Sequence, residues 1–243
     1  MSARAVLATT RRLLAQLRHD PRTLALIMLV PLVLLTLLKL LLEGDEATFQ
    51  RVGPPLLGIF PLVVMFLVTS VTMLRERTSG TLERLMTLPM SRAGLVGGYA
   101  LAFALVAAAQ GVLASGFALF ALGLEVEGSA AALVGVAIVN AELGMAFGLG
   151  LSSLATTEFQ AVQFMPAFIL PQFLLCGLLV PREQMSEALD VLAGLLPMTY
   201  AYEALADIAA GDASGAASAS LVTLGFCVLA LALGALTLRR RTP

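Results

Sequence analysis

The sequence predicts an all-α, polytopic membrane protein that forms one transmembrane domain over residues 1–243. Hydrophobic residues make up 59% of the chain and charged residues only 13%, far from the composition of a soluble domain. A membrane-spanning helix needs about 20 mostly apolar residues, and six stretches of the chain meet that need. These predicted spans are residues 23–42, 54–74, 97–123, 130–154, 161–180 and 219–238.

Residues 1–20 precede the first span and have the pattern of an amphipathic helix that lies in the membrane interface. Three arginines recur every seven residues and share one helical face, at Arg4, Arg11 and Arg18. Asp20 and Pro21 then supply a helix stop, a new N-cap and a proline at the first helical position. We therefore expect a helix break directly before the first span. A simple positive anchor explains the three arginines equally well.

The basic residues are unevenly divided between the two sides of the membrane. With six spans, twelve of the fifteen lysine and arginine residues fall on one side, and the other side receives Lys39, Arg51 and Arg182. The positive-inside rule then places both termini in the cytoplasm. We expect a multi-pass protein of a prokaryotic plasma membrane, surrounded by lipid and without a nucleic-acid partner.

A short polar segment, residues 75–92, separates the second and third apolar runs, and its pattern predicts a short helix. Gly80 can serve as its N-cap, Glu83 faces the free amides of its first turn, and Pro89 ends it. Its apolar face comprises Leu82, Leu85 and Met86. A helix of about two turns is unstable alone in water. It must therefore pack on its own bundle or on another protein.

At this segment the chain resembles the type-2 ATP-binding-cassette (ABC) permeases. The stretch Arg75-Glu76-Arg77…Gly80-Thr81-Leu82-Glu83…Leu88-Pro89 is similar to their cytoplasmic motif. A second set of residues resembles their fifth span and the hairpin before the sixth. This set is Pro166, Pro171, Gly177, Pro181, Met185 and residues 196–205.

The resemblance implies the transmembrane subunit of an ABC exporter, similar to the drug exporters. Such subunits pair, here as an expected homodimer, and two copies of an ATPase subunit drive them. The implied cargo is a small amphipathic, drug-like molecule or a lipid, moved out of the cytoplasm by alternating access. The chain itself is then not an enzyme and binds no cofactor, because ATP and Mg²⁺ belong to the partner. A phosphate-binding GxxxxGK[ST] loop needs a lysine, and the only lysine, Lys39, lies in an apolar run.

The resemblance also implies roles for individual residues. The segment after the second span becomes a coupling helix that docks into the ATPase, through Gly80, Thr81, Leu82, Glu83, Leu85 and Met86. Residues 181–218 become an external re-entrant hairpin that caps the path, with gate candidates Pro197, Tyr200, Tyr202 and Glu203. A short apolar stretch broken by proline also fits such a hairpin on physical grounds. A surface loop with an amphipathic helix is the alternative.

Polar side chains inside the spans are candidates for the substrate path. They are Gln110, Asn140, Glu142 and Gln163. An acid near mid-membrane usually faces a cavity or a partner, so Glu142 either lines the path or subunit interface or is a protonated structural group. Close helix packing is predicted for the small residues Gly144, Gly148 and Ser152. Residues 211–218, rich in Gly, Ala and Ser, are expected to be a linker.

Two other function classes are less well supported by the residues. An ion-coupled secondary carrier that uses Glu142 is the alternative function, although six spans without an evident inverted repeat do not favour it. An intramembrane enzyme is the other class, and the residues that it would need are missing. The only histidine, His19, precedes the first span, and no HExxH or CxxC motif occurs. We therefore expect neither a catalytic site nor a metal site.

Overall fold

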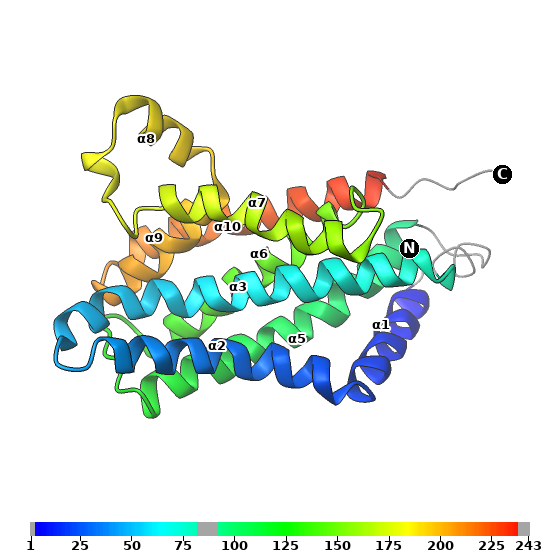
Figure 1. The fold of residues 1–243 in the computed structure, drawn as a ribbon, viewed down its shortest axis with the longest axis horizontal. Coiled ribbons are helices and arrows are strands. Elements are labelled where there is room, and N and C mark those ends of the chain that lie inside the picture. The colour runs from blue at the N-terminus through cyan, green and yellow to red at the C-terminus, as the bar shows by residue number, and fades with distance from the viewer. Residues whose placement is uncertain (1–2, 82–91, 238–243) are drawn as a thin grey trace.

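The computed structural model describes residues 3–81 and 92–237, and the regular elements in these ranges are all helices. Most of the long helices run side by side along one axis, so the molecule is an elongated bundle (Figure 1). Helix α1 and the last turns of helix α10 lie at the same end of the bundle, which we call the α1 end. We call the opposite end, which carries helix α8, the α8 end.

The first two helices are α1, Ala3–Arg18, and α2, Pro21–Leu41, and the break between them lies where the sequence predicts it. Asp20 caps α2, because its carboxylate accepts hydrogen bonds from the Thr23 amide at 3.1 Å and from the Thr23 hydroxyl at 2.6 Å. Helix α1 is amphipathic and packs against α5, Arg92–Phe120. Its buried residues are Thr9, Thr10, Leu13 and Leu17.

Helix α3, Glu46–Thr78, is 33 residues long and has more buried residues than the other helices whose burial is described. It contains the predicted span 54–74 and extends beyond it at both ends. Residues 75–78, the first part of the polar segment 75–92, form the last turn of α3. The apolar run is the part of a helix that lies in the hydrocarbon core of the membrane. The helix itself can continue through polar residues where neighbouring helices supply partners for them.

Helix α6, Ala130–Leu151, packs against α3 more extensively than any other pair of described helices. A Cβ atom at Gly144 would overlap the carbonyl oxygen of Leu62, and one at Gly148 would lie 2.6 Å from the carbonyl oxygen of Phe66. The predicted close packing at these two glycines is confirmed. Ser152, the third predicted small residue, is buried at the C-terminal end of α6.

The remaining helices are α7, Glu158–Leu175, the short α8, Glu187–Gly194, then α9, Pro197–Ala209, and α10, Ala213–Thr237. A single 3₁₀ turn, Arg182–Gln184, precedes α8. The predicted linker at 211–218 is wrong, because α10 already begins at Ala213. Asp212 makes this possible: its carboxylate accepts hydrogen bonds from the Ser214 and Gly215 amides at 3.0 and 2.9 Å and caps the helix.

Among the described residues, five helices are long and apolar enough to cross a membrane, one fewer than predicted. They are Pro21–Leu41, Glu46–Thr78, Gly94–Phe120, Ala130–Leu151 and Ala213–Leu236. The predicted span 161–180 is the exception. Its helix, α7, is only 18 residues long and carries one glutamate and three glutamines, which lower its hydropathy. The chain is nevertheless a multi-pass, all-helical membrane protein.

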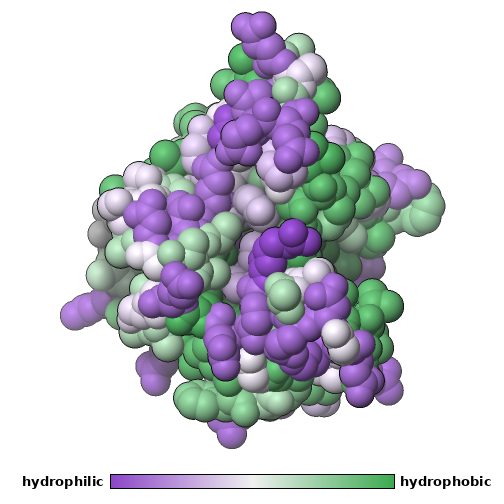
Figure 2. Space-filling model, turned by 90° about the vertical axis from the view of Figure 1, so that its left-hand side faces the viewer, coloured by the Kyte–Doolittle hydropathy of each residue, from purple (hydrophilic) through white to green (hydrophobic). Residues whose placement is uncertain are grey.

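The α8 end differs in polarity from the sides of the bundle. Figure 2 views the molecule from this end and shows hydrophilic residues over the end face, with hydrophobic residues along its flanks. Helix α8 projects sideways from the same end (Figure 1). A polar end between apolar flanks is the arrangement expected of a bundle whose long axis crosses a bilayer.

Candidate functional site

The last turn of α3 places three consecutive charged residues, Arg75, Glu76 and Arg77, against other helices at the α1 end. We call them the charged triplet. Successive residues of an α-helix are rotated by about 100°, so the three side chains leave α3 in different directions. Arg75 contacts α7, Glu76 contacts α1 and α5, and Arg77 contacts the end of α6.

Glu76 is the buried member of the charged triplet, with 7% of its surface exposed. Its Oε2 atom accepts hydrogen bonds from the Tyr99 hydroxyl of α5 at 2.8 Å and from Arg12 Nη2 of α1 at 3.1 Å. Arg12 also donates to the Tyr99 hydroxyl. A buried carboxylate with two charge-assisted partners is tolerated, whereas loss of one partner leaves an uncompensated charge. Glu76 therefore joins three helices.

Arg75 forms an exposed, bidentate ion pair with Glu158, the first residue of α7. Arg75 Nε lies 2.8 Å from Glu158 Oε1, and Nη2 lies 3.0 Å from Oε2. More than half of each side chain is exposed, at 61% and 51%. Solvent screens such a pair, so it contributes little to stability, and it links the last turn of α3 to the first residue of α7.

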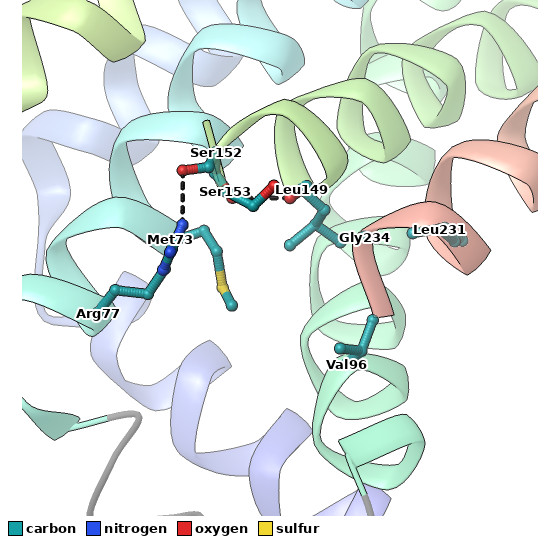
Figure 3. Close-up of a pocket in the computed structure, with 8 residues that line it drawn as sticks. All are labelled: Met73, Arg77, Val96, Leu149, Ser152, Ser153, Leu231 and Gly234. Atoms are coloured by element: carbon teal, nitrogen blue, oxygen red, sulfur yellow. Dashed lines mark hydrogen bonds between the residues drawn. The ribbon is translucent and has the colours of Figure 1, made fainter. Parts of the chain in front are cut away.

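Arg77 caps the C-terminal end of α6. Its Nη1 atom donates to the backbone carbonyl of Ser152 at 2.8 Å, and the last carbonyls of a helix lack partners within the helix (Figure 3). A cavity of about 10 Å³ lies beside this contact, between α3, α5, α6 and α10. It holds at most about one water molecule, so it is a packing defect and not a substrate site.

The charged triplet leads directly into the predicted coupling segment. Gly80 follows the end of α3 with a φ of 71°, a left-handed conformation that favours glycine, and the Thr81 and Ser79 hydroxyl oxygens lie 2.9 Å apart. The other predicted coupling residues lie outside the described residues: Leu82, Glu83, Leu85 and Met86. Their docking role stays a prediction.

The four predicted path residues differ in burial and in the helices that they contact. Gln110 and Asn140 are fully buried, and their side-chain amides donate to the backbone carbonyls of Ile27 at 2.6 Å and Ala201 at 2.8 Å. Glu142 is half-buried and lies about 200° around α6 from Asn140. Gln163 is exposed on α7. The positions of Gln110 and Asn140 favour a packing role for these two residues.

Two buried amide side chains, Gln172 and Asn140, bind the backbone of α9. Gln172 of α7 is 2% exposed, and its Oε1 atom accepts from the Met198 amide in the first turn of α9 at 3.3 Å. Asn140 of α6 holds Ala201, one turn further along α9. Gln172 and Met198 lie 26 residues apart, so no local sequence pattern indicates their contact.

The predicted gate residues all lie on α9. Pro197 is its first residue, the Tyr200 hydroxyl donates to the Gly194 carbonyl at 2.7 Å, and Glu203 Oε1 lies 2.8 Å from Arg182 Nη1. Tyr202 is half-buried, and burial is the main cause that raises the pKa of its hydroxyl. Arg182 also pairs with Asp190 of α8 at 2.8 Å. It therefore ties α8 to α9 in a way that the sequence did not reveal.

An apolar groove of about 500 Å³ runs along one side of the bundle between α2, α3 and α7. Its lining is made entirely of apolar side chains, among them Leu34, Phe60, Val64, Met165 and Phe173. Pro166 of α7 also lines it. The groove is large enough to hold part of an apolar molecule.

Comparisons with known proteins agree with the resemblance. The family profile described as "ABC-2 type transporter" matches residues 4–209. A probable multidrug ABC transporter permease, YbhR of Escherichia coli K12, is 29% identical over 163 residues, which cover 67% of this chain and 44% of that protein. ABC transporter G family member 20 of Dictyostelium discoideum is 26% identical over 141 residues, covering 58% of this chain and 19% of that protein. The match thus spans less than half the length of either relative.

Proposed function

The chain belongs to the ABC-2 type transporter family, and we propose that it is the membrane subunit of an ATP-driven exporter. The proposed assembly contains two copies of this chain and two copies of a separate ATPase subunit, which binds ATP and Mg²⁺. The chain itself catalyses no reaction in this proposal. Its cargo is a small amphipathic, drug-like molecule or a lipid.

The proposed topology has six spans, with α7 as the fifth, and both termini on the cytoplasmic side of a prokaryotic plasma membrane. Figure 1 supports it, because α1 and the last turns of α10 lie at the same end of the bundle, as an even number of crossings would place them. Helix α7 follows α6 in the chain and runs along the bundle toward the α8 end. The excess of arginines supports a cytoplasmic α1 end.

The charged triplet is the observation that carries the proposal. A coupling helix at residues 80–88 that moves when the ATPase pair closes on ATP would pull on the end of α3. Because the charged triplet contacts α1, α5, α6 and α7, that displacement reaches several spans together. Alternating access then requires that ATP binding favour the outward state over the inward state.

The apolar groove between α2, α3 and α7 supports the cargo class. A wall without polar side chains matches the hydrocarbon part of an amphipathic molecule and offers no partner for a strongly polar one. The groove also borders α3, the helix that carries the charged triplet. Movement of that helix would change the shape of the groove.

Purification with a candidate ATPase tests the proposal. An exporter subunit should co-purify with the ATPase in equal numbers and, in lipid vesicles, should export cargo only while ATP is hydrolysed. The ion-coupled carrier predicts the opposite result: transport that follows an ion gradient without ATP and is lost in Glu142→Gln. Transport of that second kind would exclude the exporter.

A further inference from the structure

Near the bend between α1 and α2, an exposed basic surface adjoins an exposed apolar stripe. Helix α1 meets α2 at a sharp bend at the α1 end of the bundle (Figure 1). A shallow concavity of about 560 Å³ on the α1 side of the bend is lined by Arg11, Leu14, Ala15, Arg18 and His19. A second one, of about 480 Å³, begins at Arg22 and continues along the apolar side chains of α2.

Among the α1 arginines, Arg12 turns into the bundle, toward Glu76. The others can therefore bind an anion at the surface. The other arginines of α1 and the first arginine of α2 are exposed: Arg4, Arg11, Arg18 and Arg22, of which Arg18 and Arg22 flank the bend. Helix α1 contains no acidic residue. The first acid of the chain, Asp20, accepts hydrogen bonds from the Thr23 hydroxyl and amide, which lower the pKa of the carboxyl and keep it negatively charged. Its single negative charge is outnumbered by the four exposed arginines, so the surface carries a net positive charge.

The apolar stripe of α2 begins one helical turn after Arg22. Arg22 is followed on the same helical face by exposed residues at intervals of three and four, namely Leu26, Leu29, Val33 and Leu37. At a rise of about 1.5 Å per residue, the stripe from Leu26 to Leu37 is about 16 Å long. This is close to half of the roughly 30 Å hydrocarbon core, the depth of one leaflet.

We propose that the bend between α1 and α2 binds an anionic phospholipid of the leaflet in which α1 lies. Arg18 and Arg22 hold the headgroup phosphate, Arg11 adds to the positive potential, and one acyl chain follows Leu26, Leu29 and Val33. Guanidinium groups suit phosphate because they present several donors in a planar fork. The lipid would fill the angle between the two helices and hold α1, and with it Arg12, in place. This inference does not depend on the transported cargo.

The test measures lipid binding to the full chain purified in detergent, by titrating its thermal stability. The probes are dioleoyl-phosphatidylglycerol and dioleoyl-phosphatidylcholine, which share their acyl chains, and glycerol 3-phosphate, which lacks them. Phosphatidylglycerol should stabilise the chain at lower concentration than phosphatidylcholine, and glycerol 3-phosphate should have no comparable effect. An equal response to both lipids, or to the headgroup alone, would overturn the proposal.

Charge variants locate the binding. Arg22→Gln and Arg18→Gln should each raise the phosphatidylglycerol concentration at half-effect about fivefold, the change typical of one basic residue near an anionic surface. Arg22→Lys should lose less affinity than Arg22→Gln, because the charge stays while the planar fork is lost. The matched control is Arg51→Gln, which removes an exposed arginine from the first turns of α3. If Arg51→Gln weakens binding as much, or if neither Arg18 nor Arg22 matters, the site is not at the bend.

Discussion

Arg12 Nη2 of α1 lies 3.1 Å from Glu76 Oε2 of α3, a contact between residues 64 positions apart in the chain. Tyr99 of α5, which is fully buried, donates to the same carboxylate. The contact therefore ties the amphipathic N-terminal helix to the turn of α3 that enters the proposed coupling segment. If α3 moves as proposed, this contact would carry α1 with it.

The substitution Glu76→Gln should destabilise the bundle by about 3 kcal/mol or more, because it leaves the Arg12 charge without its buried partner. Glu158→Gln, which breaks the exposed pair with Arg75, is the matched control and should cost under about 1 kcal/mol. Denaturant unfolding in detergent micelles, followed by circular dichroism, measures both. Equal losses in the two variants would show that burial does not set the strength of the Glu76 contact.

The double substitution Arg12→Met/Glu76→Met extends this test to both partners. Replacing a whole buried ion pair by apolar side chains is often neutral, so the double variant should recover most of the stability that Glu76→Gln loses. The same unfolding assay applies. The single variants Arg12→Met and Glu76→Met complete the comparison. If the double variant loses as much stability as the two single variants together, the two side chains act independently and the contact is not the source of the effect.

Gly144→Ala should destabilise the packing of α6 on α3, because the new methyl group overlaps the Leu62 carbonyl. Forcing an extra methyl group into a tight contact typically costs about 1–3 kcal/mol. Gly135→Ala, on the same helix, is the control: a Cβ atom there meets open space, and alanine should be neutral or stabilise α6 by about 0.5–1 kcal/mol. Thermal unfolding of the purified chain compares the two, and a more stable Gly144→Ala would refute the close approach.

Gln172→Met should loosen α9, since methionine has a similar volume but cannot accept the hydrogen bond of the Met198 amide. Thr199 is buried, and a cysteine in its place reports how often α9 opens. We expect the Thr199→Cys chain to react about tenfold faster with a maleimide when it also carries Gln172→Met than when Gln172 is kept. Cys176 and Cys227, the chain's two cysteines, are buried and are replaced by alanine in the background.

Two variants control for this reading. Gln172→Glu, in the protonated form that burial favours, keeps an acceptor for the Met198 amide and a donor for the Phe168 carbonyl, and should restore slow labelling of the Thr199→Cys chain. Gln163→Met removes an exposed amide from the same helix and should leave labelling unchanged. Fast labelling in Gln163→Met, or no rescue by Gln172→Glu, would mean that α7 is disturbed as a whole.

Leu85→Asp and Glu83→Arg should each uncouple ATP hydrolysis from export while the membrane bundle stays folded. The first places a charge on the proposed docking face, and the second reverses the charge at the start of the proposed helix. ATP hydrolysis and cargo export by the complex with its ATPase, measured in the same vesicles, give the ratio that should fall. Thr81→Ser, which keeps a hydroxyl, is the control. Coupling that persists in both variants would contradict the assignment.

The sequence determined the class of the protein and most of its helix positions. Apolar runs fix where a chain crosses the bilayer, and Asp20 with Pro21 breaks the helix through local hydrogen bonding, so both are readable without a fold. The same runs misplaced the boundaries of α7 and α10. Helix length depends on capping and on polar partners as well as on hydropathy, as Asp212 shows at the start of α10.

Tertiary structure alone decided which polar residues meet. Glu76, Asn140 and Gln172 carry no sequence signal for their partners, since each partner arrives through the packing of another helix. Gln110 and Asn140, which the sequence offered as path residues, lie buried against backbone carbonyls for the same reason. Hydropathy acts along the chain and can be read from it, whereas a buried hydrogen bond depends on how helices are placed in space.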